Sequence, residues 1–371
     1  MKKLLITNFF PPQAGGVQNY YLNLLSRLAP AEICVLAQAQ AGEKEFDQTQ
    51  PYHIYRTDFF SGKIPPRWRP LAKDISGIIQ TEKIERLIFG HFHPYNSLAG
   101  KFKLPFYVFT HGTDITQIGN NWWQKRMLKQ VYNSPLCRKF IANSEYLGEE
   151  ISKLIGNKQK VTVIYPGINY EALNKPDEDF AGKKKLLGLD DNDTIMLSMC
   201  RLEPEKNIEA IIKIMPELLS VVPELKYIIV GGGSQEEKLK NLAQQLGLKY
   251  NVIFAGEVTN IPEAKAFYLQ LAHIYVTASL KPEGFGIGYL EAAATKTAVI
   301  ASKFGGSKEA VIGGVTGILV DPQITREIKE AIIKIATDRE LWRRLTEAGQ
   351  KRAREFDWSK QIEKIKNTID N

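Results

Sequence analysis

The stretch that decides the fold is TIMLSMCRLEPEKNIEAIIKIMPELLSVVPELKYIIV, residues 194–230. It begins with the apolar run Thr194–Met199 and ends with the apolar run Tyr227–Val230. Between them, Ile208–Leu219 carries apolar residues at the spacing of an amphipathic helix. A strand, a helix and a second strand in this order predict a βαβ unit, whose two strands lie parallel in one sheet.

The same alternation extends in both directions along the chain. Further apolar runs that predict buried strands are Leu4–Thr7, Ile33–Leu36, Arg86–Phe89, Phe106–Phe109, Phe140–Ala142, Val252–Ala255, Ile274–Thr277, Ala298–Ala301 and Ile318–Val320. Only the polar, proline-containing segment Tyr165–Asp179 interrupts the alternation, and we interpret it as a linker. The chain is therefore predicted to be an α/β protein with two Rossmann-like, doubly wound domains, residues 1–168 and 169–354. A terminal helix of about 355–371 is expected to pack back on the first domain.

Composition is typical of a soluble globular protein, with 44% apolar and 24% charged residues among 371. No apolar run reaches the roughly 20 residues that a membrane-spanning helix requires. The apolar start, Leu4–Phe10, contains Asn8 and no cleavage site follows, so we interpret it as a buried strand and not a targeting segment. Three widely spaced cysteines (Cys34, Cys137 and Cys200) show neither a disulfide framework nor metal-ligand spacing, which favours a reducing, cytoplasmic setting.

Metal binding is not expected from the five histidines. His91 and His93 are close in sequence but have no third candidate ligand nearby. The formal net charge of +8 suggests an anionic partner, which could be nucleic acid, a phosphorylated substrate or an anionic membrane surface. A solvated basic surface without a specific role is the alternative.

In parallel α/β sheets, ligands bind beyond the carboxyl ends of the strands, so residues that follow strands are the candidates for function. Gly15 and Gly16 stand between the first strand and a helix, where backbone can approach a phosphate or a sugar. The absence of GxGxxG argues against an ordinary dinucleotide-binding dehydrogenase. His111, in HGTD, follows the strand Phe106–Phe109, where an imidazole would face the ligand crevice; an ordinary hydrogen-bonded loop histidine is the alternative.

Candidate nucleotide contacts follow the strands of the second half. RLEPEKN, residues 201–207, places Arg201 and Lys206 after a strand, and two fixed cations there suit a diphosphate whose negative charge grows as it leaves. Gly232, in VGGGS, offers exposed backbone to a nucleotide. Val258, shortly after the strand Val252–Ala255, is a further candidate contact.

The most informative motif is PEGFGIGYLEA, residues 282–292. Gly284, Phe285 and Gly286 begin a helix, whose first backbone N–H groups point toward an anion. Glu283 stands just before this helix and can accept hydrogen bonds from sugar hydroxyls. Glu291, eight residues later and inside the helix, can accept hydrogen bonds from ribose.

Taken together, these segments resemble the retaining glycosyltransferases of family 4. FPPQAGGVQNY, HGTD, RLEPEKN and EGFGIGYLE occur in the order typical of that family, and GGSKEAV and GVTGILVDP resemble two later segments of it. The resemblance covers nearly the whole chain. It implies the GT-B fold, in which a cleft between two Rossmann-like domains holds a sugar nucleotide, and metal-independent transfer of a hexose.

For the first half of the chain, the resemblance implies that Gly16 lies beside the donor phosphates and the acceptor, and that His111 contacts the transferred sugar near its reacting carbon. The sequence also departs from the family pattern at three positions. Asp114 in HGTD leaves the acceptor geometry open, Gly288 replaces a bulkier residue and could loosen the sugar pocket, and Lys308 stands where proline is frequent.

For the second half, the resemblance implies that Arg201 and Lys206 hold the diphosphate. It places Glu283 against the sugar hydroxyls, with the backbone of Phe285–Gly286 nearby. Glu291 is implied to bind the ribose.

Donor and acceptor are predicted less directly. TNFFPPQAGGVQNY, residues 7–20, is similar to mannosyltransferases that act on phosphatidylinositol mannosides, which makes GDP-mannose the leading donor and UDP-glucose or another UDP-sugar the next. The acceptor is expected to be a hydroxyl of a lipid-linked molecule or a glycan. Tryptophan, lysine and arginine mix in Ser61–Lys73 and Asn120–Phe140, which suits peripheral binding to the anionic inner face of the cell membrane, although tryptophans packed in the core would explain the pattern equally well.

Several other functions remain open. A UDP-sugar-dependent glucosyl- or N-acetylglucosaminyltransferase would carry similar motifs, and a sugar-nucleotide epimerase can have the same two-domain architecture. A basic nucleic-acid-binding protein is disfavoured because no recognised RNA- or DNA-binding motif is present.

Overall fold

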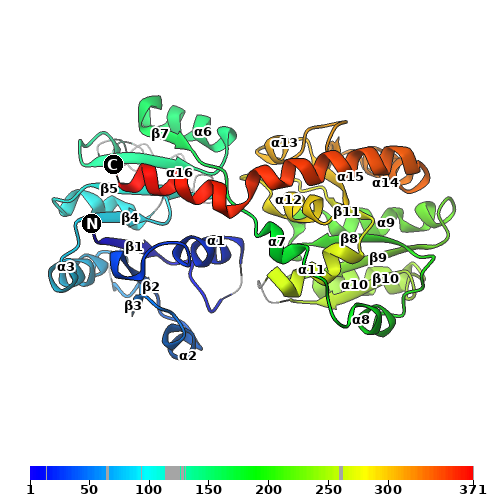
Figure 1. Cartoon of the computed structure of the whole chain (residues 1–371), viewed down its shortest axis with the longest axis horizontal. Coiled ribbons are helices and arrows are strands. Elements are labelled where there is room, and N and C mark those ends of the chain that lie inside the picture. The colour runs from blue at the N-terminus through cyan, green and yellow to red at the C-terminus, as the bar shows by residue number, and fades with distance from the viewer. Residues whose placement is uncertain are drawn as a thin grey trace. The chain divides into compact units, whose positions relative to one another are not determined.

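A computed structural model of the chain describes residues 1–13, 15–63, 67–92, 94–112, 126, 129, 131–258 and 262–370. Its parallel strands form two sheets, each in its own structural unit (Figure 1). The first unit comprises Met1–Pro166 and Gln361–Asn371, and the second comprises Gly167–Lys360. The prediction of two Rossmann-like α/β domains is confirmed by these two parallel sheets.

In the first unit, the described residues form a parallel sheet in the order β3-β2-β1-β4-β5-β6-β7. Its strands are β1 Lys3–Thr7, β2 Ile33–Gln38, β3 His53–Thr57, β4 Arg86–Phe89, β5 Phe106–Thr110, β6 Cys137–Ala142 and β7 Val161–Val163. The helices are α1 Gly16–Leu25, α2 Glu43–Gln48, α3 Leu71–Glu82 and α6 Glu145–Ile155, with 3-10 turns at Pro30–Glu32, Tyr95–Lys101 and Lys158–Lys160. The inner strands are almost fully buried because helices cover both faces of the sheet.

In the second unit, the described strands form a parallel sheet in the order β10-β9-β8-β11-β12-β13. They are β8 Thr194–Met199, β9 Leu225–Val230, β10 Val252–Gly256, β11 Ile274–Thr277, β12 Ala298–Ser302 and β13 Ile318–Val320. The helices are α7 Tyr170–Leu173, α8 Phe180–Leu186, α9 Ile208–Leu219, α10 Glu236–Gln245, α11 Pro262–Leu271, α12 Ile287–Ala294, α13 Ser307–Ala310, α14 Thr325–Thr337 and α15 Arg339–Ala353. Short 3-10 turns lie at Pro204–Lys206 and Arg354–Phe356.

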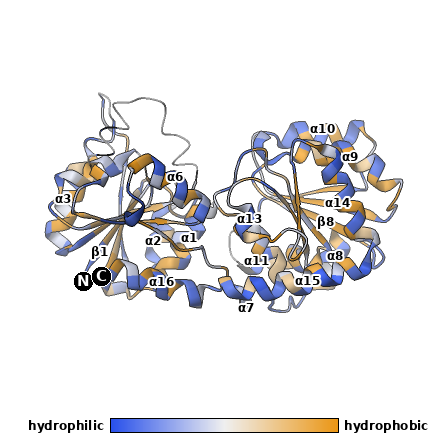
Figure 2. Ribbon diagram, turned by 90° about the horizontal axis from the view of Figure 1, so that it is seen from above, coloured by the Kyte–Doolittle hydropathy of each residue, from blue (hydrophilic) through white to orange (hydrophobic). Residues whose placement is uncertain are grey.

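Hydropathy follows these layers within each unit. Figure 2 shows mainly hydrophobic strands and helices in which hydrophilic and hydrophobic residues alternate. Helix α9 illustrates the pattern, since Ile208, Ile211, Ile212 and Met215 are buried against the sheet of the second unit. Burying apolar surface in this way contributes about 25 cal/mol per Å² removed from water, which makes these faces the main stabilising feature of each unit.

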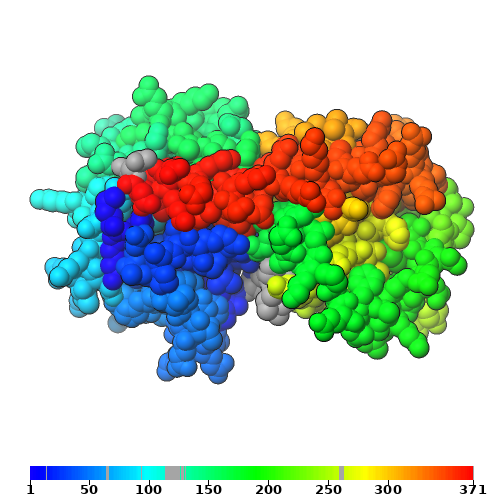
Figure 3. Space-filling view, viewed as in Figure 1, coloured from blue at the N-terminus to red at the C-terminus, as the bar shows by residue number. Residues whose placement is uncertain are grey.

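The last helix, α16, spans Trp358–Asp370 and its C-terminal part belongs to the first unit (Figure 1). There the Asp370 carboxylate lies 2.7 Å from the ammonium of Lys3, whose side chain is only 3% exposed. Arg86 donates a hydrogen bond to the carbonyl of Ile369. The space-filling view shows α16 lying along the surface beside the N-terminal residues (Figure 3).

The segment predicted to be a linker is more ordered than expected. It contains α7, in which Tyr170 and Leu173 are buried, and this short helix packs against α11. The Trp358 ring also lies against Gly167, so closely that a Cβ at Gly167 would fall 2.5 Å from it. From Gly167 on, this segment is therefore part of the second unit, because apolar side chains of α7 are buried there.

Candidate active site

Both sheets reverse their strand order at one place. In the first unit the chain proceeds from β1 through β2 to β3 on one side, and then from β4 through β7 on the other. In the second unit the corresponding reversal lies between β8 and β11. Ligands of open α/β sheets bind at these switch points, outside the carboxyl ends of the strands. We therefore take the loops that follow β1, β4, β8 and β11 as the candidate sites.

At the switch point of the first unit, a tyrosine joins three segments. Tyr21, on the buried face of α1, is 0% exposed, and its hydroxyl donates to the carbonyl of Gly90 at 2.6 Å. The same hydroxyl lies 2.8 Å from Nε2 of His111, which follows β5. Because the single hydroxyl proton points to a carbonyl that can only accept, Nε2 of His111 must be the donor in the second bond. Tyr21 therefore selects the tautomer of His111 and fixes its orientation.

Gly90 allows this close approach. A Cβ at Gly90 would fall 2.9 Å from the Tyr21 hydroxyl oxygen and 2.8 Å from Cβ of Thr7. Real Cβ atoms essentially never come so near to other heavy atoms, so any larger residue here would displace Tyr21. Glycine after β4 is thus required by packing within the chain.

Gly16, the first residue of α1, is different. A Cβ at Gly16 would meet nothing within 4 Å, whereas one at Gly15 would fall 2.2 Å from Oε1 of Gln18. The atoms near Gly15 are the end of a flexible side chain, which can move, so packing within the chain requires glycine at neither position. The open space around Gly16 leaves its backbone accessible to a ligand at the start of α1.

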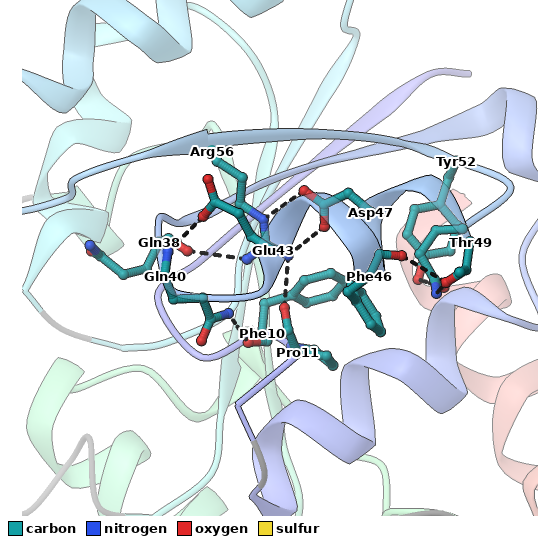
Figure 4. Close-up of polar contacts among 11 residues, drawn as sticks. Phe10, Pro11, Gln38, Gln40, Glu43, Phe46, Asp47, Thr49, Tyr52 and Arg56 are labelled. Atoms are coloured by element: carbon teal, nitrogen blue, oxygen red, sulfur yellow. Dashed lines mark hydrogen bonds and ion pairs between the residues drawn. The ribbon is translucent and has the colours of Figure 1, made fainter.

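The loop between β1 and α1 is anchored by an arginine that the sequence did not single out (Figure 4). Arg56, on β3, donates to the carbonyl of Pro11 at 2.7 Å and to both carboxylate oxygens of Asp47 at 2.6 and 3.0 Å. Nearby, Gln40 donates to the carbonyl of Phe10 at 2.7 Å. The Arg56 side chain is only 7% exposed, so its ion pair with Asp47 is largely desolvated. These bonds hold the backbone that leads to the glycine pair.

In the second unit, the loops after β8 and β11 meet in an ion pair. Nζ of Lys206 lies 2.5 Å from Oε1 of Glu283, and the hydroxyl of Ser279 donates to the same oxygen at 2.5 Å. Burial of Glu283 opposes its ionisation, but the charge and hydrogen bond of Lys206 and the hydroxyl of Ser279 outweigh this and lower the pKa of the carboxyl. Glu283 is therefore an anion near neutral pH. Arg201 is exposed and adds to the positive potential at this carboxylate.

Glu291 lies on α12 and is held by a lysine that the sequence did not single out. Nζ of Lys265, on α11, lies 3.1 and 3.2 Å from the two carboxylate oxygens of Glu291, and each side chain is 13% exposed. The side chain of Phe285, at the turn before α12, is buried against Phe356 with ring centroids 5.5 Å apart. Phe285 therefore presents backbone and not its ring, while Gly286 adopts a left-handed φ of 92° that begins the helix.

Two further loops are hydrogen-bonded to the loops at this switch point. The expectation of exposed backbone at Gly232 was wrong, because Gly232 is buried and its carbonyl accepts from the N–H of Leu202, in the loop that carries Arg201. The N–H of Gly306 donates to the carbonyl of Glu283 at 2.9 Å, which joins the loop after β12 to the one after β11. Gly284 and Val258 are half-buried, and Val258 follows β10.

Gly288 does not leave an empty pocket. A Cβ at Gly288 would fall 2.7 Å from the hydroxyl oxygen of Tyr275, which itself donates to the carbonyl of Met199 at 3.1 Å. The expected loosening of the sugar pocket is therefore offset by Tyr275, which fills the space beside this glycine. Asp114, His93, Trp122 and Trp123 lie outside the described residues, as do parts of both basic-aromatic segments.

Comparison with known proteins identifies the family. Residues 14–172 match the family Glycosyltransferase Family 4, and residues 179–352 match the family Glycosyl transferases group 1. The chain belongs to the family 4 glycosyltransferases. The resemblance inferred from the motifs is thus confirmed, and the enzyme is a sugar-nucleotide-dependent glycosyltransferase.

Two relatives match this chain over most of its length and most of their own. The GDP-mannose-dependent monoacylated alpha-(1-6)-phosphatidylinositol monomannoside mannosyltransferase of Corynebacterium glutamicum is 26% identical, covering 99% of this chain and 97% of its own. The GDP-mannose-dependent alpha-(1-6)-phosphatidylinositol monomannoside mannosyltransferase of Mycolicibacterium smegmatis is 28% identical, covering 90% and 89%. Among solved structures, Anabaena HepE in complex with UDP-glucose has a TM-score of 0.84 at 20% identity, covering 100% of this chain and 99% of that one, which shows that the two share the fold.

Proposed function

We propose that this glycosyltransferase moves mannose from GDP-mannose to a hydroxyl of a lipid-linked acceptor, with retention of anomeric configuration and without a metal ion. The donor and the class of acceptor are taken from the two mannosyltransferases that the chain resembles over most of its length. Among the described residues, no helix is long and apolar enough to cross a membrane.

The observation that carries the proposal is the ion pair of Lys206 and Glu283 at the switch point of the second unit. An ammonium group has three N–H donors, so the bond to Glu283 leaves two for phosphate oxygens. The exposed guanidinium of Arg201 supplies a second cation in the same loop. The ionised Glu283 can accept hydrogen bonds from sugar hydroxyls, which a protonated carboxyl would do less well.

These groups suit attack from the face of the leaving group. In this mechanism the bond between the anomeric carbon and the diphosphate oxygen breaks, and the acceptor oxygen bonds to the same face of that carbon. The departing diphosphate oxygen takes the acceptor proton, so no enzyme carboxylate forms a covalent adduct. Arg201 and Lys206 would stabilise the negative charge that develops on the diphosphate, which is the largest contribution that a protein typically makes to such a step.

The remaining proposed contacts are those expected from the sequence motifs and from the family resemblance. In the first unit, His111 would contact the transferred sugar, and Gly15–Gly16 would approach the phosphates and the acceptor. In the second, Glu291 would accept from the ribose hydroxyls in exchange for part of its bond to Lys265, while backbone at Gly232, Val258 and Gly284–Gly286 would line the nucleotide.

A thermal-shift panel of GDP, UDP, GDP-mannose and UDP-glucose tests the donor, because a ligand that binds only the folded protein raises the melting temperature. We expect the largest rise with GDP-mannose. Transfer to phosphatidylinositol monomannoside in detergent micelles should persist in EDTA, and NMR of the product should show the donor's anomeric configuration. A larger rise with UDP-sugars would show that GDP-mannose is not the donor. Loss of transfer in EDTA would overturn metal independence, and a product with inverted anomeric configuration would overturn the mechanism.

A further inference from the structure

A buried histidine at the switch point of the first unit has no role in the function proposed above. His91 follows Gly90 at the carboxyl end of β4 and is 3% exposed. Neither of its ring nitrogens has a hydrogen-bond partner in the described part of the chain. Each buried polar atom without a partner costs a protein about 1–3 kcal/mol, so the position calls for an explanation other than stability.

The surroundings of His91 are made by the loops that follow adjacent strands. Its ring centroid lies 4.4 Å from that of the half-buried Phe9, which follows β1, and 5.5 Å from that of His111, which follows β5. The Tyr21 hydroxyl, which is close to both segments, donates its proton to Gly90 and not to His91. The His91 ring therefore packs beside Phe9 and His111, but the hydrogen bonds of Tyr21 do not hold it.

The chemistry of this imidazole favours a hydroxyl as its ligand. Burial lowers the pKa of His91 to about 3, so near neutral pH the ring is uncharged and has one N–H donor and one acceptor nitrogen. A sugar hydroxyl can both donate and accept, whereas a phosphate only accepts and would favour a cation. A metal site is not supported, since no three candidate ligands among His, Cys, Asp and Glu gather within the described residues.

We propose that His91 binds a hydroxyl of the sugar substrate, either on the transferred hexose or on the acceptor, and so satisfies its nitrogens only in the complex. This inference rests on the proposed transfer of a hexose. Because the ring is enclosed before substrate binds, the hydroxyl reaches it when a neighbouring side chain shifts, as hydrogen bonds in active sites often form only in the complex.

Replacing His91 separates a binding role from a structural one. In His91→Phe a ring of similar size remains, while both unpaired nitrogens disappear. We expect an unchanged or higher melting temperature together with a 10- to 100-fold lower kcat/KM. This fold-change is roughly what is lost when the substrate hydroxyl is bound without its hydrogen bond to His91. The matched control is His273→Phe, because Nδ1 of His273 accepts from the backbone N–H of Ile195 at 3.0 Å. That variant should be less stable and retain its kcat/KM. A His91→Phe protein that melts several degrees lower and keeps its kcat/KM would overturn the proposal.

The wild-type protein gives a second test that does not depend on how a variant folds. In spectra of ¹⁵N-histidine-labelled protein, GDP-mannose should move the His91 resonances more than GDP does if the transferred hexose is the ligand. Phosphatidylinositol monomannoside should move them if the acceptor is the ligand. No movement with either compound would overturn the inference. If the wild-type protein transfers no hexose at all, the proposed function fails first, whereas an active enzyme with a silent His91 refutes only this inference.

Discussion

The bond between Tyr21 and His111 gives the sharpest prediction about the site of the first unit. Tyr21→Phe removes one buried hydroxyl, leaves the Gly90 carbonyl without its donor at 2.6 Å and deletes the 2.8 Å bond to Nε2 of His111. Leaving buried groups unpaired costs about 1–3 kcal/mol, and in a unit of this size each kcal/mol lowers the melting temperature by about 2–4 °C. The substitution should therefore destabilise the first unit measurably without unfolding it.

The second consequence concerns the tautomer of His111. In the wild-type protein, long-range ¹H–¹⁵N spectra should show a proton on Nε2 of His111, and in Tyr21→Phe this preference should weaken. Turnover should fall while the KM for the donor changes little, because a misoriented imidazole affects the reacting carbon more than nucleotide binding.

Tyr132→Phe is the matched control for that experiment. The Tyr132 hydroxyl is equally buried, donates to the Phe92 carbonyl at 2.7 Å and accepts from Nδ2 of Asn96 at 2.5 Å. It should destabilise the unit by a similar amount and leave the His111 spectrum unchanged. An unaltered His111 spectrum in Tyr21→Phe would refute the argument that the hydroxyl selects the tautomer.

Three further predictions concern other parts of the chain. Gly16→Ala should keep or raise stability by about 0.4–1 kcal/mol, since a Cβ there meets no atom within 4 Å, yet it should lower transfer by obstructing the substrate; unchanged kinetics would contradict this. Arg201→Ala and Lys206→Ala should each reduce kcat about 100- to 1000-fold with the fold intact by circular dichroism, and an active double variant would show that the cations are dispensable. Glu82→Gln should lower the free energy of unfolding at pH 7 by about 1.5–3 kcal/mol, because Lys2, Tyr55 and His53 bond to that carboxylate and lower its pKa from 4.5 to about 2. A carboxyl whose pKa is lowered by folding stabilises the fold at pH values above its unfolded pKa, and this gain disappears as the pH falls toward the folded pKa of about 2. Urea titrations should therefore show that the difference in free energy of unfolding between the wild-type protein and Glu82→Gln shrinks between pH 4.5 and pH 2.

The sheets were largely predictable because buried parallel strands are continuous apolar runs. All six strands of the second unit were expected within one or two residues, and helix α9 was expected with the bounds it has. Strand β3, HIYRT, was not expected. It lies at the edge of the sheet, its residues are half-buried or exposed, and its sequence mixes apolar and polar side chains. Pattern alone cannot tell such a strand from a loop, since half of its surface meets water.

In the candidate sites, single residues could be predicted from the sequence, but the contacts between them could not. Lys206 and Glu283 each follow a strand, but their contact across 77 positions depends on β8 and β11 being neighbours, which the sequence does not state. Tyr21 is harder still, because a tyrosine on the buried face of a helix looks like any core residue until Gly90 and His111 are seen beside it. The same holds for Lys265, whose partner Glu291 lies on the following helix.

Among the described residues, the two switch points differ in electrical character, and the difference agrees with the roles proposed for them above. The described groups at the first unit's switch point include the Tyr21 hydroxyl, which holds Gly90 and His111, and the uncharged imidazole of His91, which we propose to bind a sugar hydroxyl. The second unit instead presents Arg201 and Lys206, with Glu283 neutralising part of their charge. Cations gain most where charge develops, which fits the proposed contact of Arg201 and Lys206 with the departing diphosphate, and a neutral imidazole fits the proposed contact with a sugar hydroxyl. His91→Lys would place an unpaired charge at a buried position, so we expect a lower melting temperature than for the wild-type protein in a thermal-shift measurement.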